Sequence, residues 1–529
     1  MLINMGKILK ENARMFADRT ALINVERNRR FTYKEFHEIT NKICNIMTNE
    51  FGLKEGDVFA SLLENDNASL FGVWCMKGIP SGLWLNIRDS FDEHLYQLDY
   101  LPPQLIFLEN RFLDSYYDAL KQRGIKIVCM DRPDVARENV HYFWDLMEKA
   151  PAAETDVEYV ADDVNKHVVI FKFTGATTGR GKCVARNAYI HLFAAYRSYA
   201  TTEDIFFTDT RYLCMTPITH ASGALLLPVH FKGGTIITLN RADLEPVCQT
   251  IEKEKVTLTY VVPTILYRML DLGLEKKYDL SSLKTIRYGA APISPAKLES
   301  LVKAFGVIFV QGYSATEALT PVTILGKREH LIKTDQDKKR MSSVGRAIPG
   351  VEIRIAGEDG SELPPNQTGE IQMRGPVVIG GYYKDPEQTE KNFTKNGFWK
   401  SGDLGYMDED GYLYLVDRKK DMIISGGFNI YSVEVENVLN LHPAVRESAV
   451  IGIPSEEWGE AVHAEVILKE KVAGLTEEEL IDYCRSKIAR YKLPKSIKFV
   501  EEFPLSPSGK VLRRKLKDKY WQSVERRIN

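Results

Sequence analysis

The feature that most constrains the fold is a repeated alternation of short apolar runs with longer amphipathic stretches. Amphipathic stretches such as 243–255 and 295–305 separate runs rich in β-branched residues, which predict strands at 167–173, 234–239, 256–262, 283–289 and 307–313. Strands that alternate with helices of this length are typical of a largely parallel, doubly wound α/β sheet. Ligands in such sheets bind outside the carboxyl ends of the strands, so the turns after these runs are the candidate sites.

The pattern of predicted elements changes towards the C-terminus. Short strand patterns broken by Gly and Pro predict a β-rich, barrel-like subdomain at about 320–415. A charged stretch at 417–421 then leads into a segment with its own strand and helix patterns. We therefore predict a large N-terminal domain, 1–419, and a small α+β C-terminal domain, 420–529, joined by a hinge near Lys420.

Composition excludes several classes of protein. The chain has 529 residues, 44% of them hydrophobic, which is enough for several packed cores and excludes a disordered chain. The net charge is −2, which argues against broad nucleic-acid binding. The seven cysteines include no C-x-x-C pair, and the N-terminus lacks the apolar segment of a signal peptide. We expect a cytoplasmic protein with reduced thiols, as a monomer or a homodimer.

One uncharged run, 212–231, is long enough to span a bilayer. It also contains two prolines, two histidines and several hydroxyl side chains. We interpret it as buried core and pocket wall, and we predict no transmembrane segment.

A Gly- and Thr-rich turn follows the first predicted strand, F-T-G-A-T-T-G-R-G-K at 173–182. Backbone N–H groups, Thr hydroxyls and a Lys in such a turn can hold phosphate oxygens. A Walker P-loop would need Gly at 176 and Ser or Thr at 183, where this chain has Ala and Cys. The hydroxyl that would bind magnesium is therefore missing, and a Walker-type ATPase is not predicted.

Three further turns carry chemistry that suits a nucleotide. The stretch Q-G-Y-S-A-T-E at 311–317 offers an aromatic face for a base, a hydroxyl for phosphate, and in Glu317 a hard oxygen ligand for Mg²⁺. Asp403, in K-S-G-D, is suited to accept hydrogen bonds from ribose hydroxyls. Lys510 closes the loop P-L-S-P-S-G-K near the C-terminus. Each turn alone is a weak signal.

Taken in order, these motifs resemble those of the adenylate-forming superfamily of acyl-CoA synthetases, adenylation domains and luciferases. The resemblance extends from F-T-Y-K-E-F at 31–36 to G-K-V-L-R-R-K-L at 509–516. It includes the phosphate loop, T-P-I-T-H at 216–220, G-A-A-P at 289–292, Q-G-Y-S-A-T-E, S-V-G-R-A-I-P-G at 343–350, G-E-I at 369–371, K-S-G-D-L-G at 400–405, and the hinge run D-R-K-K-D-M-I-I-S-G-G-F-N-I-Y at 417–431.

The resemblance implies a role for each matching residue. The β- and γ-phosphates would be held by Thr174, Thr177, Thr178, Gly179 and Lys182. The adenine slot would be formed by Gly289, Ala290, Ala291, Pro292 and Tyr313. Thr316 would contact phosphate, Glu317 would bind Mg²⁺, Asp403 and Arg418 would hold the ribose, and Lys510 would bridge the substrate carboxylate and the α-phosphate. The acyl pocket would contain His220 as its gate, with Ser222, Tyr288, Gly312 and Ser314. Lys420 would be the hinge, and Gly427 would line the pantetheine tunnel.

The implied activity is an ATP-dependent carboxylic acid–CoA ligase that uses Mg²⁺ and coenzyme A. Loading of a carrier protein and non-catalytic nucleotide binding are alternatives, and a luciferase-like oxygenase remains formally open. Amino-acid activation needs an acidic partner for the substrate ammonium, and residues 216–224 contain no Asp or Glu.

The chain departs from the family pattern in two places. The phosphate loop has Gly175, Ala176, Gly181 and Cys183 where Ser, Gly, Pro and Gly are usual, which predicts a weaker grip on pyrophosphate. Ser314 replaces a usual Gly on the pocket wall, and Tyr288 is bulky. We expect a pocket for short, cyclic or aromatic acids, unless Tyr288 is simply a core residue.

Overall fold

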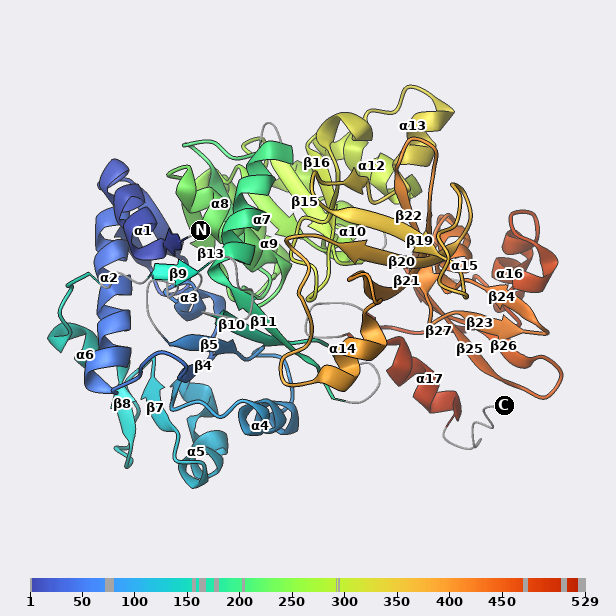
Figure 1. Ribbon diagram of the computed structural model, residues 1–529. Coiled ribbons are helices and arrows are strands. Elements are labelled where there is room, and N and C mark those ends of the chain that lie inside the picture. Colours follow the sequence, from blue (N-terminus) through green and yellow to red (C-terminus); the bar gives the residue numbers. More distant parts are fainter. Residues whose placement is uncertain are drawn as a thin grey trace.

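The computed structural model describes residues 2–71, 80–154, 158–160, 168–175, 180–201, 205–291, 293, 295–469, 474–505 and 511–521. It confirms the expected mixed α/β fold with largely parallel sheets and a separate C-terminal domain built on a mainly antiparallel sheet (Figure 1). Five of the residues predicted for the site lie outside the described residues: Thr177, Thr178, Gly179, Pro292 and Lys510.

Two large sheets form the body. The nine-stranded sheet has the order β18 (Arg346–Ala347), β17 (Thr323–Leu325), β16 (Phe309–Tyr313), β15 (Thr285–Gly289), β14 (Leu258–Val261), β12 (Arg211–Cys214), β13 (Thr235–Thr238), β2 (Thr20–Asn24), β3 (Arg29–Thr32). The seven-stranded sheet has the order β11 (Cys183–Asn187), β10 (Val168–Phe173), β5 (Ser81–Trp84), β4 (Val58–Leu62), β6 (Leu105–Leu108), β7 (Lys126–Cys129), β8 (Val140–Tyr142). A short pair, β1 (Leu2–Asn4) and β9 (Glu158–Val160), stands apart from both.

Helices cover both faces of these sheets. One apolar core lies between the two sheets and includes side chains of α1 (Met5–Met15), α2 (Tyr33–Asn45), α6 (Phe143–Lys149), α7 (Ala188–Thr201) and α8 (Leu226–Phe231). A second core packs the far face of the nine-stranded sheet against α9 (Leu244–Glu254), α10 (Pro263–Asp271), α11 (Leu274–Lys277) and α12 (Pro295–Phe305). A third packs the seven-stranded sheet against α4 (Phe91–Tyr100) and α5 (Leu113–Gln122). Because both faces are covered, the central strands are buried on both faces rather than alternating between buried and exposed residues.

The β-rich region expected at 320–415 is divided between two sheets. Its first strands, β17 and β18, extend the edge of the nine-stranded sheet by antiparallel pairing. A separate antiparallel sheet contains β19 (Glu352–Ala356), β20 (Gly369–Arg374), β21 (Trp399–Met407) and β22 (Leu413–Arg418). The separate antiparallel sheet therefore begins at Glu352, about 30 residues after the predicted start of the β-rich region at 320.

The C-terminal region has its own sheet of β24 (Phe428–Ile430), β23 (Ile423–Ser425), β26 (Gly459–Leu468), β25 (Val445–Ser455) and β27 (Ser496–Phe499). Two helices, α15 (Ser432–Leu439) and α16 (Glu477–Arg485), share one core with this sheet, and α17 (Arg513–Trp521) contributes Leu516 to a second. The C-terminal region lies at the right of the molecule in Figure 1, beyond the sheet of β19 to β22.

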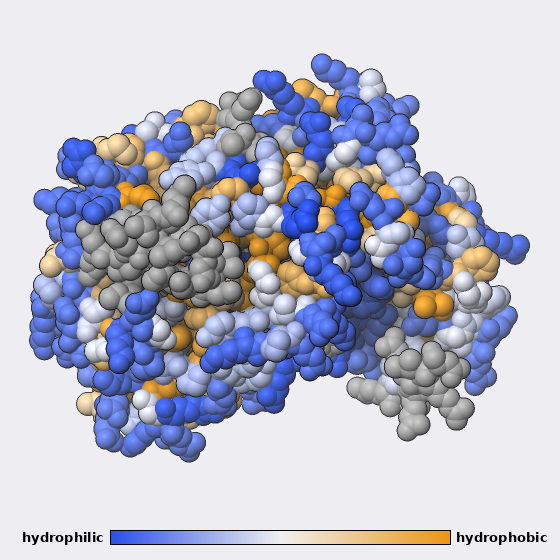
Figure 2. All heavy atoms as spheres, in the orientation of Figure 1, coloured by the Kyte–Doolittle hydropathy of each residue, from blue (hydrophilic) through white to orange (hydrophobic). Residues whose placement is uncertain are grey.

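The remaining helices are short: α3 (Asn65–Ala68), α13 (Asp335–Arg340) and α14 (Pro386–Asn392). The uncharged run 212–231 folds into β12, a 3₁₀ turn (Ala221–Leu225) and the six-residue α8. In the described ranges, no helix has the length and apolar character needed to cross a bilayer. Figure 2 shows a largely hydrophilic surface on this face, with apolar side chains gathered near its centre.

Candidate functional site

The phosphate-loop candidate is a hairpin loop between β10 and β11, and its neck is closed by hydrogen bonds. Thr174 N donates to Lys182 O over 2.9 Å, and Lys182 N donates to Thr174 Oγ1 over 3.0 Å. A Cβ added at Gly181 would lie 2.5 Å from Thr174 O. The neck as it is closed here leaves no room for a side chain at 181, so proline at this position would require the neck to shift.

Lys182 points from this neck towards the segment that carries α14. Its Nζ lies 3.3 Å from Asn392 Oδ1 and 4.4 Å from the ring centre of Tyr382. Burial lowers the pKa of Lys182, and the nearby charges of Glu317 and Asp385 oppose that shift. The lysine is thus positioned beside the predicted metal ligand.

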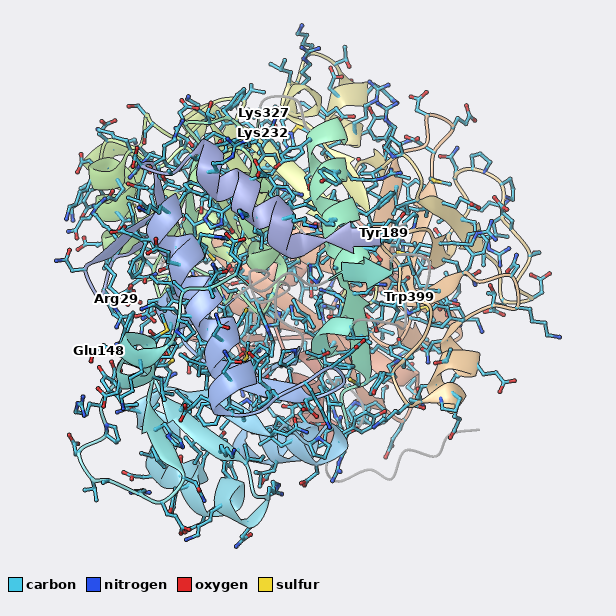
Figure 3. All side chains as sticks on the ribbon, turned by 60° about the vertical axis from the view of Figure 1, so that its left-hand side comes forward. Arg29, Glu148, Tyr189, Lys232, Lys327 and Trp399 are labelled. Atoms are coloured by element: carbon cyan, nitrogen blue, oxygen red, sulfur yellow. The ribbon has the colours of Figure 1, made fainter. Side chains whose placement is uncertain are left out.

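Glu317 is buried at the loop after β16, with 8% of its surface exposed. Its Oε1 accepts a hydrogen bond from Tyr382 Oη over 2.9 Å. Tyr382 is in turn held by Trp399, labelled in Figure 3, whose Nε1 donates to the Tyr382 hydroxyl over 3.3 Å. A carboxylate oriented by a neutral hydroxyl is suited to offer oxygen to a divalent cation.

The described side chains around Glu317 do not form a complete metal site by themselves. Among the described residues, no group of three or more His, Cys, Asp or Glu side chains is arranged to hold a metal ion. Mg²⁺ commonly binds through one or two carboxylates together with substrate phosphates. A single buried Glu317 beside a phosphate loop fits that mode of binding.

The residue before this glutamate is anchored by a buried arginine that the sequence analysis did not identify. Arg186, on β11 and 4% exposed, donates from Nη2 to the carbonyl oxygen of Thr316. Burial lowers the pKa of Arg186 to about 10, and the charge of Glu317 opposes the shift. Arg186 thus fixes the backbone from which Glu317 projects.

Tyr313 and Asp403 connect the nine-stranded sheet to the β19–β22 sheet. Tyr313 Oη donates to Asp403 Oδ2 over 2.6 Å. Arg418 lies opposite Asp403 in the β21–β22 ladder, with Nε 3.6 Å from Oδ1. Burial and the adjacent Asp403 raise the pKa of Tyr313 well above its ordinary value. The structure therefore brings together three of the residues predicted to hold the nucleoside.

The turn after β15 is strained. Ala290 has a φ of 65°, in the left-handed region that non-glycine residues seldom adopt. A Cβ on Gly289 would meet Gly312 O at 2.5 Å, so a side chain at 289 would force these two strand ends apart. Strain of this kind concentrates at ligand sites. Gly289, Ala290 and Ala291 thus shape the end of β15 beside Gly312.

His220 and Ser222 lie on the turn after β12. Asn86 Nδ2 is 3.1 Å from His220 Nε2, so a residue of the seven-stranded sheet region orients the predicted gate. The Ser222 hydroxyl is buried and donates to Pro217 O over 2.9 Å. Ser222 therefore stabilises the turn that carries His220.

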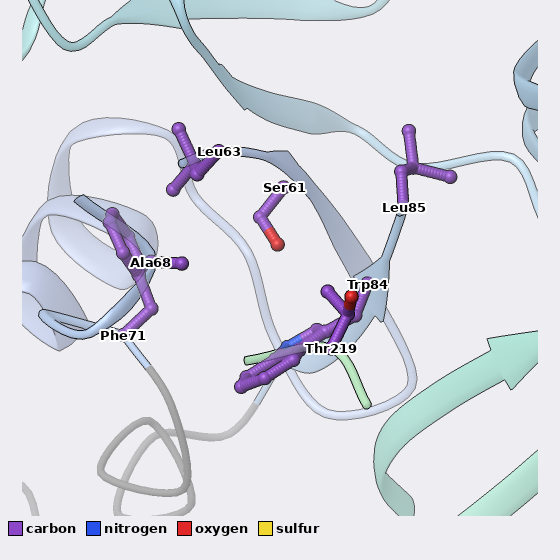
Figure 4. A pocket seen from close by; sticks show the side chains of 7 residues that line it. All are labelled: Ser61, Leu63, Ala68, Phe71, Trp84, Leu85 and Thr219. Carbon is purple, nitrogen blue, oxygen red and sulfur yellow. The ribbon is translucent and has the colours of Figure 1, made fainter. Parts of the chain in front are cut away.

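Two cavities lie near these turns. A cavity of about 10 Å³, enough for roughly one water molecule, lies between the ends of β4 and β5 and Thr219, next to His220 (Figure 4). Its lining contains Ser61, Leu63, Ala68, Phe71, Trp84, Leu85 and Thr219. A second cavity, of about 470 Å³, is lined by Glu64, Ile87, Arg88, Arg111, Asn240, Arg241, Ala242 and Asp243. Its lining holds three arginines and two acids, and one of the arginines, Arg111, is paired with Glu64 over 2.7 Å.

The structure corrects one predicted pocket residue. Tyr288 has no exposed surface and packs in the core beneath α10 and α12, beside Phe309. Its hydroxyl lies 2.9 Å from His330 Nε2 and 3.2 Å from Gln311 Oε1. Tyr288 is therefore a core residue, because alternate side chains of β15 point to opposite faces of the sheet. Ser314 is partly exposed at the end of β16, and its role in the pocket remains a prediction.

Cys183, one of the departures from the family pattern, is buried behind the phosphate loop. Burial raises the pKa of its thiol to about 12. The side chain is 1% exposed. Cys183 is therefore a packing residue rather than a reactive thiol.

The predicted hinge region joins the two domains at a hydrogen-bonded carboxylate. Asp417, buried at the end of β22, accepts from the Ser432 hydroxyl at the start of α15 over 2.9 Å. Lys420 is exposed, and Gly427, with a φ of 81°, lies in the tight β23–β24 hairpin turn. The segment after Lys510 is anchored by Arg513, whose Nη2 lies 2.7 Å from both carboxylate oxygens of Glu436.

Comparison with known proteins identifies the family. The AMP-binding enzyme family matches residues 9–383, and the AMP-binding enzyme C-terminal domain matches residues 434–510. The chain belongs to this family of adenylate-forming enzymes. The membership inferred from the motifs is thereby confirmed, and the activity class is that of an AMP-forming acid–thiol ligase.

Several relatives are characterised. The chain is 35% identical over 455 residues to a medium/long-chain-fatty-acid–CoA ligase of Mycobacterium tuberculosis, covering 83% of this chain and 77% of that protein. It is 32% identical over 521 residues to a 2-succinylbenzoate–CoA ligase of Bacillus licheniformis, covering 98% and 100%. The solved o-succinylbenzoate CoA synthetase of Bacillus subtilis, in complex with its acyl-adenylate, has a TM-score of 0.82 at 28% identity and covers 98% and 99%.

Sequence reasoning missed the supporting residues of the site. Tyr382, Asn392 and Asn86 carry no local signal, because each is brought to the site only by packing. Arg186 and Arg287 do carry one, because each is a charged residue inside an apolar strand pattern. Such a charge in a buried strand needs a partner or a ligand.

Proposed function

We propose that this chain is an ATP-dependent carboxylic acid–CoA ligase. It would form an acyl-adenylate with release of pyrophosphate, then transfer the acyl group to the thiol of CoA. The observation that carries the proposal is the convergence of two clusters at the carboxyl ends of β15 and β16. One contains Tyr313, Asp403 and Arg418, and the other contains Glu317 and Lys182.

The division of labour follows from the charges. Tyr313, Asp403 and Arg418 would orient the nucleoside, with Asp403 accepting hydrogen bonds from the ribose. Lys182 and the neck of the phosphate loop would hold the outer phosphates. Glu317 would hold Mg²⁺, which supplies positive charge against the phosphate oxygens.

In the first step, a carboxylate oxygen of the acid attacks the α-phosphorus of ATP. The bond from that phosphorus to the oxygen bridging to the β-phosphate breaks, and pyrophosphate leaves. Lys510, carried on the C-terminal domain, would neutralise both the carboxylate and the α-phosphate, which otherwise repel each other.

In the second step, the sulfur of CoA attacks the acyl carbon, the bond to AMP breaks, and the thiol proton passes to solvent. Rotation near Lys420 would withdraw Lys510 and bring Gly427 towards the pantetheine path. The cavity lined by Arg88, Arg111 and Arg241 also contains Glu64 and Asp243, which leaves a small positive excess that would favour a phosphate of CoA.

The experiment that tests this function is a panel of carboxylic acids with ATP, Mg²⁺ and CoA, in which AMP release and thioester formation are measured. Acid-dependent AMP release together with thioester formation is expected. AMP release without thioester would favour loading of a carrier protein, and no AMP release with any acid would overturn the proposal.

The catalytic lysine gives a sharper test. Lys510→Ala should lower the rate of acyl-adenylate formation about 10³-fold, because the charge at the α-phosphate is lost. Thioester formation from a synthetic acyl-adenylate should stay within about threefold. Lys515→Ala is the matched control, because Lys515 is an exposed lysine on α17. Equal losses in both half-reactions would contradict the alternation of domains.

A further inference from the structure

Arg287 is a buried cation to which the described part of the chain offers no hydrogen-bond acceptor. It lies in the middle of β15 and is 1% exposed. Its Nε, Nη1 and Nη2 are all buried and form no hydrogen bond with any described residue. An arginine keeps its positive charge at any physiological pH, so it cannot escape this burial by losing its proton.

The side chain points to the opposite face of β15 from the core residue Tyr288. A Cβ added at Gly312 would lie 3.1 Å from Arg287 Nη2. Burial lowers the pKa of Arg287, and the groups that oppose the shift are the phenols of Tyr260 and Tyr212. Both are neutral at physiological pH, so neither is a counter-ion.

These neighbours belong to the acyl side of the site. Gly312 is a predicted pocket residue, and a Cβ on Gly289 would lie 3.2 Å from Tyr260 Oη. Tyr212 Oη donates to the carbonyl oxygen of Ser222 over 2.9 Å, just after His220. The uncompensated guanidinium therefore lies among the residues that would surround the acyl group.

A buried, unpaired guanidinium is unfavourable, and a bidentate carboxylate is the ligand that compensates it best. We propose that Arg287 determines substrate class by binding a second carboxylate, so that the preferred substrate is a dicarboxylic acid activated at one end. This inference rests on the proposed ligase function. The first carboxylate would attack the α-phosphorus of ATP beside Thr316 and Lys510, and the second carboxylate would pair with Arg287.

The guanidinium is closed off from solvent, which sharpens the specificity that it would confer. An acid with a methyl group in place of the second carboxylate would leave Arg287 unpaired in the complex. Sites with buried polar groups reject analogues that lack the matching group strongly. We expect wild-type kcat/KM to be at least about 100-fold higher for a dicarboxylic acid than for its matched monocarboxylic acid.

The test uses pairs of equal length: succinate with butyrate, glutarate with pentanoate, and adipate with hexanoate. AMP release is measured for each pair with the full-length wild type, Arg287→Met, Arg287→Lys and Arg268→Met. Arg268 is exposed on α10 and is the matched control. Arg287→Met should lose the preference for the diacid, and Arg287→Lys should retain part of it, because lysine keeps the charge but not the fork.

A binding readout separates recognition from a structural role. The best diacid alone should raise the thermal unfolding midpoint of the wild type and not that of Arg287→Met. Without ligand, Arg287→Met should unfold at a temperature about 2 °C higher than the wild type, because an unpaired buried charge is gone. A structural arginine would give the opposite shift and equal losses for diacid and monoacid.

The outcomes distinguish the two proposals. Efficient turnover of monoacids by the wild type without a preference for diacids would overturn the role of Arg287 and leave the ligase function standing. Stabilisation by a diacid that requires Arg287, with no AMP release from any acid, would support the site and overturn the ligase function.

Discussion

Arg287 and Arg513 carry the same charge into two parts of the molecule with different surroundings. Arg513, at the start of α17, has a side chain 18% exposed and is paired with Glu436, itself 10% exposed. Arg287, in the nine-stranded sheet, is buried more deeply and has no acidic partner among the described residues. Removing one partner of a buried ion pair destabilises the fold, because the other charge is left unpaired, whereas an unpaired buried charge is tolerated where a ligand completes it.

The largest effect expected from this comparison is on Arg513. Arg513→Met should lower the free energy of unfolding of the C-terminal region by about 3 kcal/mol, because Glu436 would be left buried without its cation. Denaturant unfolding followed by a probe in that region measures it. Arg514→Met, at an exposed neighbour, should change stability by less than about 0.5 kcal/mol. A gain in stability for Arg513→Met would contradict the claim that Glu436 depends on Arg513 as its partner.

His330 is also buried, but a histidine, unlike an arginine, can avoid a buried charge by losing its proton. Burial lowers its pKa to about 4, and it stays neutral between Tyr288 Oη and Gly326 O. The unfolded chain takes up the proton near pH 6.5, so this contribution to stability is complete above that pH and is lost as the pH falls.

Between pH 7 and pH 5, His330 should therefore remove about 2 kcal/mol from the free energy of unfolding. His330→Gln should make that fall shallower, and the difference between the two pH profiles isolates the contribution of this residue. Parallel profiles would show that the histidine is not held neutral. Arginine has no such route, which is why Arg287 needs a ligand.

The smallest expected effect concerns Tyr382, the partner of Glu317. Tyr382→Phe keeps the ring beside Lys182 but removes the hydroxyl, at a cost of about 1 kcal/mol in orienting the carboxylate. The Mg²⁺ concentration for half-maximal AMP release should rise about fivefold. Tyr406→Phe, stacked on Tyr414, is the control. An unchanged Mg²⁺ dependence would mean that Glu317 is positioned without Tyr382.

Much of the fold followed from local pattern. The strand predicted at 283–289 is observed at Thr285–Gly289, and the helix predicted at 295–305 has those bounds. The predicted β-rich region at 320–415 included β17 and β18, whereas β17 pairs with β16 and β18 pairs with β17 at the edge of the nine-stranded sheet. Such pairing is tertiary and leaves no trace in a short run of sequence. Local sequence thus predicts an element more reliably than its partner.

The site was predicted less completely, and β15 shows why. Both faces of this strand are buried, so hydrophobic alternation does not tell which face borders the acyl side. The sequence therefore led to Tyr288 as a pocket residue, whereas Tyr288 packs in the core and Arg287 lies on the opposite face beside Gly312. The charge itself was the available signal, because an arginine in a fully buried strand departs from the pattern around it.

The neck of the phosphate loop has a consequence for the engineering of this chain. Because a Cβ at 181 would lie 2.5 Å from Thr174 O, a single Gly181→Pro substitution would force the two strands apart. Introducing the family's proline therefore requires several coordinated changes in the loop. Engineers who graft the common loop into this enzyme should exchange residues 174–183 as one block.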